Sequence, residues 1–250
     1  MTSTSTPPPG SIIPNVGALV ARSCRAHARL PAVTSATRSI TYGELEQRSN
    51  RLANALLSGG LARGDRVGIY LHNCVEIVEI EIACYKAGLV KAPFNARLSP
   101  REVGEIAANS EARIIVTTAA RAEAFRPHLA DPGVQLLLLD GPAGSDYESR
   151  LAQAGAHFEP MAVREHELAV LHYTSGSSGV LKAAMQTFGN RLAQLRKFLM
   201  RGEGMQAGHV LGLVGPITHA SGMQLVPALC TGACIHLFAQ FEPAGFIAEM

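Results

Sequence analysis

The residues with the clearest chemical potential form one short run, Thr174-Ser175-Gly176-Ser177-Ser178-Gly179, with Lys182 three positions later. Such a run is costly to order, because glycine loses much backbone freedom and Ser and Thr offer competing hydrogen bonds. Inward-turned backbone N–H groups, four hydroxyls and a lysine could together bind a phosphate chain. The spacing fits neither the Walker pattern nor G-x-G-x-x-G, and a solvated turn with a surface lysine remains the alternative for the loop taken alone.

A phosphate loop needs regular elements to hold it. An apolar segment that ends near Tyr173 predicts a strand before the loop, and the residues from about Thr187 predict a helix after it. We therefore expect a strand, loop and helix in succession, with the loop's amides facing an anion.

Short apolar strands alternate with helical lengths along the rest of the chain. Capping boxes at Thr41/Glu44 and Ser99/Glu102 predict helix starts, and Val75 to Ala87 predicts a helix that ends at Gly88. Strands are expected at 66–71, 112–117, 134–139, 167–174 and 209–214, the third covered on both sides. This alternation predicts an α/β fold of layered parallel sheets flanked by helices.

The domain organisation follows from composition. Residues 1–13 are rich in Ser, Thr, Pro and Gly and are expected to form a flexible tail, so the folded domain covers 14–250. The segment near 140–165 carries Gly141-Pro142 and little apolar pattern, which indicates a connection between sub-lobes.

Composition excludes several classes of protein. A net charge of +2 with no basic cluster argues against a nucleic-acid partner, and no apolar run is long enough for a membrane span. Without a secretory signal pattern, a cytoplasmic location is expected. The five cysteines are odd in number and form no C-x-x-C pair, so neither a disulfide framework nor a metal site is predicted.

The loop and its surroundings resemble a known family. "YTSGSSGVLKA" resembles the phosphate-loop signature of the adenylate-forming superfamily, which contains acyl- and aryl-CoA synthetases, luciferases and peptide-synthetase adenylation domains. "SITYGELEQRSNRLANALLSGGLARGDRVGIYLHNCVE", "YKAGLVKAPFNARLSPREV" and "PITHASGMQLVPALCTGACIHLFAQFEP" resemble successive parts of its large N-terminal domain. The resemblance covers the chain from about Val16 and is nearest to an acyl- or aryl-CoA ligase.

The resemblance implies two groups of site residues. ATP phosphate binding falls to Thr174, Ser175, Gly176, Ser177, Ser178, Gly179 and Lys182. The acyl pocket is expected to include His219, Ser221, Gly222 and Met223. The family's main catalytic lysine, its metal and ribose elements and its small C-terminal domain would lie beyond Met250, so residues 1–250 alone are expected to be inactive.

The implied reaction is activation of a small-molecule carboxylic acid by ATP and Mg²⁺, followed by transfer of the acyl group to coenzyme A. Since "PITHASG" offers no acid to pair with an ammonium group, a fatty, alicyclic or aryl acid is favoured over an amino acid. Transfer to the phosphopantetheine of an acyl carrier protein is one alternative, and a nucleotide-binding remnant that does not adenylate is another. Leu181, Ala183 and Phe188 depart from the family pattern. Because Ala183 adopts positive φ less freely than Gly, it is expected either to shift the loop's exit or to make the site less tolerant of ATP.

Overall fold

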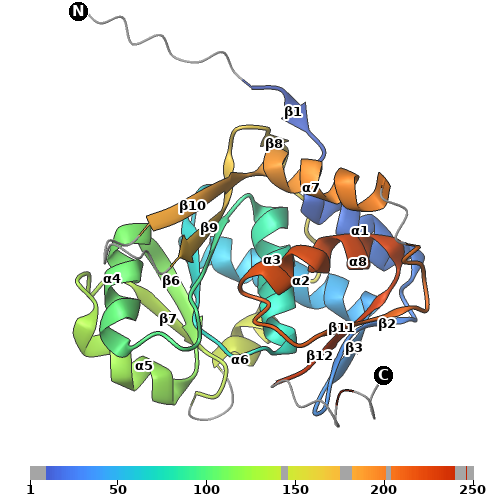
Figure 1. The fold of residues 1–250 in the computed structure, drawn as a ribbon. Coiled ribbons are helices and arrows are strands. Elements are labelled where there is room, and N and C mark those ends of the chain that lie inside the picture. The colour runs from blue at the N-terminus through green and yellow to red at the C-terminus, as the bar shows by residue number, and fades with distance from the viewer. Residues whose placement is uncertain (1–9, 142–145, 175–181, 201–203, 240–245, 247–250) are drawn as a thin grey trace, which may run out of the picture.

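Two main β-sheets and the helices around them make up the protein, seen here in a computed structural model that describes residues 10–141, 146–174, 182–200, 204–239 and 246 (Figure 1). The larger sheet has six strands in the order β10-β9-β5-β4-β6-β7 and the smaller has four, in the order β11-β12-β2-β3. The larger sheet comprises β4 (Arg66–Ile69), β5 (Val90–Pro93), β6 (Ala112–Thr117), β7 (Gln135–Leu138), β9 (Leu168–Thr174) and β10 (Lys182–Thr187). The smaller comprises β2 (Pro31–Ser35), β3 (Ser39–Thr41), β11 (Val210–Leu213) and β12 (Cys234–Leu237).

The pairing is mostly parallel, which confirms the α/β class. The neighbours β9, β5, β4, β6 and β7 run parallel, as do β11, β12 and β2. Two outer strands are antiparallel to their neighbours: β3 to β2 and β10 to β9. The sheets are therefore mixed rather than purely parallel.

Helices begin and end largely where local signals place them. Both capping boxes form, with the Thr41 and Ser99 hydroxyls each accepting from the backbone N–H of the glutamate three residues on. Gly88 ends its helix in the left-handed conformation at φ 64°, which an L side chain rarely adopts. The helices are α1 (Val16–Ala26), α2 (Tyr42–Ser58), α3 (Val75–Ala87), α4 (Pro100–Ser110), α5 (Ala119–Phe125), α6 (Asp146–Gln153), α7 (Phe188–Met200) and α8 (Leu225–Thr231), with short 3₁₀ turns at Arg126–His128 and Ala220–Gln224.

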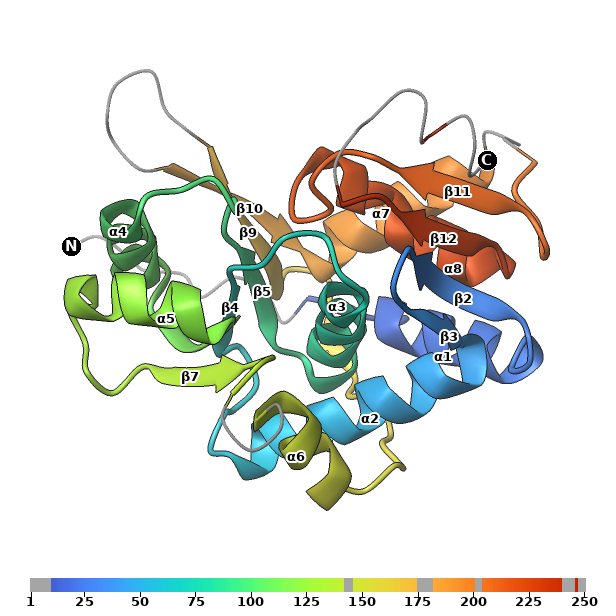
Figure 2. The same ribbon diagram turned by 90° about the horizontal axis from the view of Figure 1, so that it is seen from below.

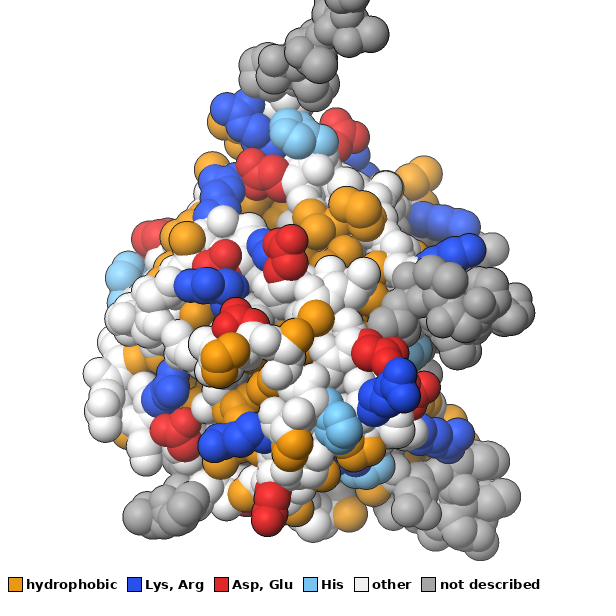
Figure 3. Space-filling model, turned by 90° about the vertical axis from the view of Figure 1, so that its left-hand side faces the viewer, with side chains coloured by type: hydrophobic (Ala, Val, Ile, Leu, Met, Phe, Trp, Pro, Cys, Tyr) orange, Lys and Arg blue, Asp and Glu red, His pale blue; other side chains and the backbone are white. Residues whose placement is uncertain are grey.

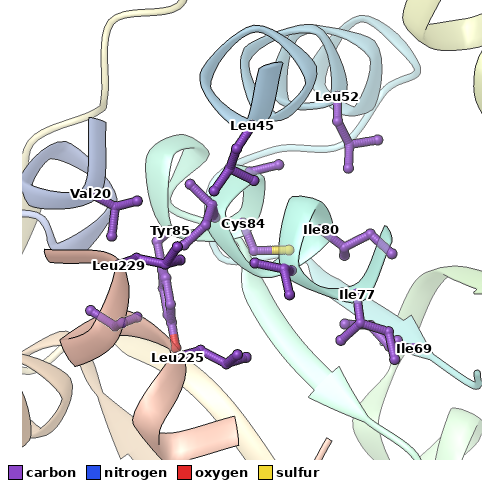
Figure 4. Close-up of a cluster of buried hydrophobic side chains, with 14 of the residues drawn as sticks. Val20, Leu45, Leu52, Ile69, Ile77, Ile80, Cys84, Tyr85, Leu225 and Leu229 are labelled. Carbon is purple, nitrogen blue, oxygen red and sulfur yellow. The ribbon is translucent and has the colours of Figure 1, made fainter. Parts of the chain in front are cut away.

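Helix α3 lies at the centre of the molecule, between the two sheets (Figure 2). Twelve of its thirteen residues are buried, and it packs against β5 of one sheet and β2 of the other. Leu45 and Leu52 of α2, Val20 of α1 and Leu229 of α8 surround its apolar side chains (Figure 4). A helix buried on all sides shows little amphipathic pattern, and its three charged buried residues, Glu79, Glu81 and Lys86, need partners inside the protein.

Three outer parts of the fold can be compared with the sequence predictions: the strand at 134–139, the segment at 140–165 and the N-terminal tail. The strand expected at 134–139 is β7, but it lies at the sheet edge, so only Leu137 of its four residues is fully buried rather than the whole strand being covered on both sides. The 140–165 segment contains α6, which packs on α2, and β8 (Val163–Arg164). β8 pairs with β1 (Ile12–Ile13), at the end of the expected tail; residues 1–9 lie outside the described residues.

The surface carries a mixture of charges. On the face in Figure 3, Lys and Arg side chains are interspersed with Asp and Glu. No helix among the described residues is both long and apolar enough to cross a membrane.

Candidate functional site

The phosphate loop connects two antiparallel strands. Thr174 ends β9 and is the register partner of Lys182, which begins β10 and is exposed. Ser175, Gly176, Ser177, Ser178 and Gly179 lie outside the described residues, and so does the side chain of Thr174. The hairpin thus holds Lys182 at the mouth of the loop, next to the residue at which the loop begins.

The expected strand, loop and helix succession is wrong in one respect. β10 comes between the loop and α7, so the helix does not follow the loop directly. Ala183 lies within β10, opposite Tyr173, and positive φ at a non-glycine residue occurs among the described residues only at Glu111. The expected shift caused by Ala183 therefore lacks its physical basis, since an extended strand residue needs no left-handed conformation.

Phe188, another departure from the family pattern, lies in the protein core. It is the first residue of α7 and only 1% exposed, and its ring packs edge-on against Tyr85 with 6.1 Å between centroids. Phe188 is therefore a core residue that joins α7 to α3. Leu181 lies outside the described residues.

The acyl residues lie together in one tight segment between β11 and α8. His219 is half-buried and its Nδ1 lies 3.0 Å from the Thr218 hydroxyl. Gly222 donates its backbone N–H to the His219 carbonyl, and a Cβ at Gly222 would lie 1.8 Å from the Ile217 carbonyl oxygen. Only glycine fits this turn, so the spacing of His219, Ser221, Gly222 and Met223 follows from the backbone itself.

Asn73 holds the start of this segment. It follows β4 and precedes α3, and its side-chain amide donates to the Gly215 carbonyl at 3.0 Å and to the Phe238 carbonyl at 3.2 Å. The side-chain oxygen Oδ1 of Asn73 accepts from the Ile217 N–H at 2.9 Å. Asn73 could not be identified from the sequence, because its partners lie more than 140 positions away.

A second anchor holds the end of the segment. Gln194 of α7 donates to the Met223 carbonyl at 3.0 Å and accepts from Arg191 at 2.6 Å. Arg191 is only 4% exposed, and its Nε is the one buried side-chain polar atom without a hydrogen-bond partner in the described part of the chain. α7 therefore connects the acyl segment to a buried charge cluster.

That cluster is centred on Glu81 of α3. Glu81 accepts from Lys91 of β5 at 2.6 Å and from the Tyr85 hydroxyl at 2.9 Å, and it lies 3.5 Å from Arg191. Burial raises the pKa of Glu81, but Lys91 and Arg191 outweigh it, so that its pKa lies below the usual value. Two cations and one carboxylate leave this cluster with a net charge of +1.

Two neighbouring imidazoles, those of His172 and His219, have pKa values lowered by burial and by cations of this cluster. Burial, followed by the charges of Lys91 and Arg191, lowers the pKa of His172 to about 4. Burial and Lys91 also lower the pKa of His219. Both rings are therefore neutral at physiological pH. Charged residues inside the apolar runs "IVEIEIACYKA" and "VKAP" were the sequence signal that could have pointed to this cluster.

The described residues suit a nucleotide's phosphates better than they suit a metal ion. Lys182 at the loop's mouth suits a polyphosphate, because an exposed ammonium can approach its oxygens. No group of three His, Cys, Asp or Glu side chains that could hold a metal comes together within the described ranges. The described part of the chain thus places an exposed lysine where a phosphate contact is predicted, and it holds no clustered carboxylates for Mg²⁺.

Comparison with known proteins places this arrangement in a family. The model of the AMP-binding enzyme family matches residues 20–250. A feruloyl-CoA synthase of Amycolatopsis is 31% identical over 94% of this chain and 46% of its own length, and 4-coumarate--CoA ligase 1 of Solanum tuberosum is 28% identical over 84% and 40%. The chain spans about half the length of these relatives.

Solved structures agree on the fold. The N-terminal domain of FACL13 from Mycobacterium tuberculosis superposes with a TM-score of 0.83 at 24% identity, over 94% of this chain and 60% of that one. ATP-bound MatB from Rhodopseudomonas palustris gives a TM-score of 0.81 at 26% identity, over 94% and 47%. With a family model that matches nearly its whole length, the chain belongs to the AMP-binding enzymes.

Proposed function

We propose that this protein activates an aryl or other apolar carboxylic acid with ATP and passes the acyl group to coenzyme A. The observation that carries the proposal is the placement of Lys182 opposite Thr174 at the mouth of the family's phosphate loop. The names of relatives support the substrate class: feruloyl-CoA synthase, 4-coumarate--CoA ligase and 3-hydroxybenzoate--CoA ligase all activate aromatic acids.

In the first step, a carboxylate oxygen attacks the α-phosphorus of ATP, the bond from that phosphorus to the bridging oxygen breaks, and pyrophosphate leaves. The role of this chain is positioning and charge stabilisation. Lys182 and the loop would hold the β- and γ-phosphates, and Mg²⁺, when bound, would neutralise part of the charge on pyrophosphate. In the second step a thiolate attacks the acyl carbon and AMP leaves.

The residues of the acyl segment favour an acid without an ammonium group over an amino acid. Residues 216–222 contain no acid that could pair with an ammonium group. Lys91 interacts with both His219 and His172, and its cluster with Arg191 and Glu81 has a net positive charge that would repel such a group.

Transfer to a carrier protein is the second candidate. It is supported by the L-proline--[L-prolyl-carrier protein] ligase of Pseudomonas fluorescens, which is 30% identical over 66% of this chain and 33% of its own length. Incubating the acyl-adenylate with coenzyme A or with a phosphopantetheinylated carrier protein separates the two acceptors.

Replacing Lys182 tests the activation step. In the natural full-length protein, Lys182→Ala should lower kcat/KM for ATP in pyrophosphate exchange by roughly 10- to 150-fold, as expected for loss of a charge-assisted hydrogen bond worth about 1.5–3 kcal/mol. Lys197→Ala is the matched control, because Lys197 is an exposed lysine of α7. An unchanged kcat/KM for ATP would remove Lys182 from the site. Absence of exchange with every acid, in a folded protein that still binds ATP, would favour the non-adenylating alternative.

A further inference from the structure

His172 faces the side of the sheet on which the acyl segment lies. Along β9, Leu171 and Tyr173 pack into the hydrophobic cluster beneath α4 and α5. Val170 packs into the other cluster, around α3, which also contains Ile217 and Leu225 from either side of the acyl segment. Because side chains alternate along a strand, His172 shares the face of Val170.

Four ionisable groups from four elements surround His172 closely enough to affect its charge. They are Lys91 of β5, Arg191 of α7, Glu81 of α3 and His219 before α8. Lys91 is the register partner of Val170 on β9, and Arg191 is linked through Gln194 to the Met223 carbonyl. The cluster therefore connects the His172 face of β9 to the acyl segment that contains His219.

The His172 ring is available for a ligand. It is half-buried, and neither of its nitrogens hydrogen-bonds to any of the described residues. Burial and, after it, the charges of Lys91 and Arg191 lower the pKa of the ring and keep it neutral, and a neutral imidazole carries one donor and one acceptor. Such a ring can accept from a hydroxyl or donate to an ether or carbonyl oxygen.

The position of His172 along β9 indicates which part of an acid it could reach. It lies two residues before Thr174, at which the phosphate loop begins, so it is about 7 Å deeper along the strand. The reacting carboxylate must lie near the phosphates. A group that meets His172 is therefore further along the acyl chain or ring.

We propose that His172 is a specificity-determining residue of the acyl site, which hydrogen-bonds an oxygen substituent of the acid remote from its reacting carboxylate. This inference rests on the proposed function and refines its substrate class to oxygenated aryl or acyl acids.

Matched acids that differ by one hydroxyl test the proposal. Pyrophosphate exchange by the natural full-length protein is measured with cinnamate and 4-coumarate, and with benzoate and 3-hydroxybenzoate. The wild-type protein should prefer the hydroxylated member of at least one pair by about tenfold in kcat/KM, and His172→Leu should reduce that ratio to about one, mainly by loss on the hydroxylated acid. His172→Asn, which keeps a donor and an acceptor, should restore part of the preference.

Controls separate recognition from folding. His209→Leu makes the same substitution at an exposed histidine and should leave the ratio unchanged. Thermal unfolding of each variant shows whether it is folded, and if His172→Leu is not, His172→Asn and His172→Gln provide the comparison. Calorimetric binding of the same acids gives a readout that does not need turnover.

Three outcomes would overturn the inference. The first is a wild-type protein that activates these acids without preferring the hydroxylated acid in either pair. The second is a folded His172→Leu variant in which kcat/KM falls equally for both acids of a pair. Both leave the proposed function standing. If none of the four acids is activated, the proposed activation of aryl acids falls. Binding that still discriminates through His172 would then support the residue's role, and an absence of binding would overturn it too.

Discussion

Two buried glutamates on α3, Glu79 and Glu81, are two positions apart yet have different surroundings. Glu79 accepts from Arg48 at 2.6 Å and from the Tyr147 hydroxyl at 2.8 Å, with Arg38 at 3.6 Å. The side chains of Arg48 and Arg38 remain 19% and 31% exposed and also contact Glu148. The Glu79 network therefore reaches solvent.

The Glu81 cluster is enclosed by comparison. Its cations, Lys91 and Arg191, have side chains only 3% exposed, and both interact electrostatically with His172. One helix thus carries a carboxylate that ties α2 and α6 to the core and another that sets the charge beside the site. The comparison shows that burial of a carboxylate alone does not reveal its role; the exposure of its partners does.

The largest effect should come from removing each carboxylate in turn. Glu81→Leu leaves two buried cations without their counter-charge and should lower the free energy of unfolding by about 3–5 kcal/mol. Glu79→Leu should cost about 1–3 kcal/mol, because Arg48 and Arg38 can turn towards water. Urea unfolding of both variants measures the difference.

A compensating substitution checks the cause. Adding Lys91→Met to Glu81→Leu removes one of the stranded cations, so the double variant should be more stable than Glu81→Leu alone. Equal stability of the two would show that packing, rather than the unpaired charge, dominates the loss.

The next effect concerns the link from the Glu81 cluster to the acyl segment. Gln194→Ala removes the hydrogen bond to the Met223 carbonyl and should raise KM for the acid roughly fivefold, equivalent to about 1 kcal/mol, with KM for ATP unchanged. The matched control is Gln186→Ala, because Gln186 also accepts from Arg191, at 3.4 Å, but has no bond to the acyl segment in the described structure. Steady-state kinetics with each substrate varied in turn provide the measurement. A parallel rise in both KM values, or the same rise in Gln186→Ala, would argue against a positioning role.

Much of the fold was predictable because its signals are local. The two capping boxes and the glycine after Ala87 placed the starts of α2 and α4 and the end of α3. β10 was missed because five of its six residues are polar or Ala on an exposed outer strand, and such a strand has little alternation of burial to reveal it.

The roles of the candidate site residues that a contiguous motif supplies stay a prediction. The structure shows only that His219, Ser221, Gly222 and Met223 fall in one turn and that Lys182 is the register partner of Thr174. Asn73 and Gln194 were not identified, because their contacts with the acyl segment exist only after distant elements pack. His172 was read as an ordinary strand residue, since the charges that make it unusual come from three other elements.

The smallest effect should be a dependence of stability on pH that arises from the Glu81 side of α3. The pKa of His172 is about 4 in the folded protein and about 6.5 when unfolded, so between these values the unfolded chain binds the extra proton. Stability contributed by the neutral ring is therefore present above about pH 6.5 and is lost as the pH falls towards 4.

His172→Asn removes this contribution. Between about pH 7 and pH 5 the wild-type protein should lose on the order of 1 kcal/mol more unfolding free energy than His172→Asn does, measured by urea unfolding at each pH. His209→Asn, at an exposed position, should behave like the wild type. Carboxylates common to all three proteins cancel in this difference, so equal losses in wild type and His172→Asn would show that burial and the neighbouring cations do not hold His172 neutral.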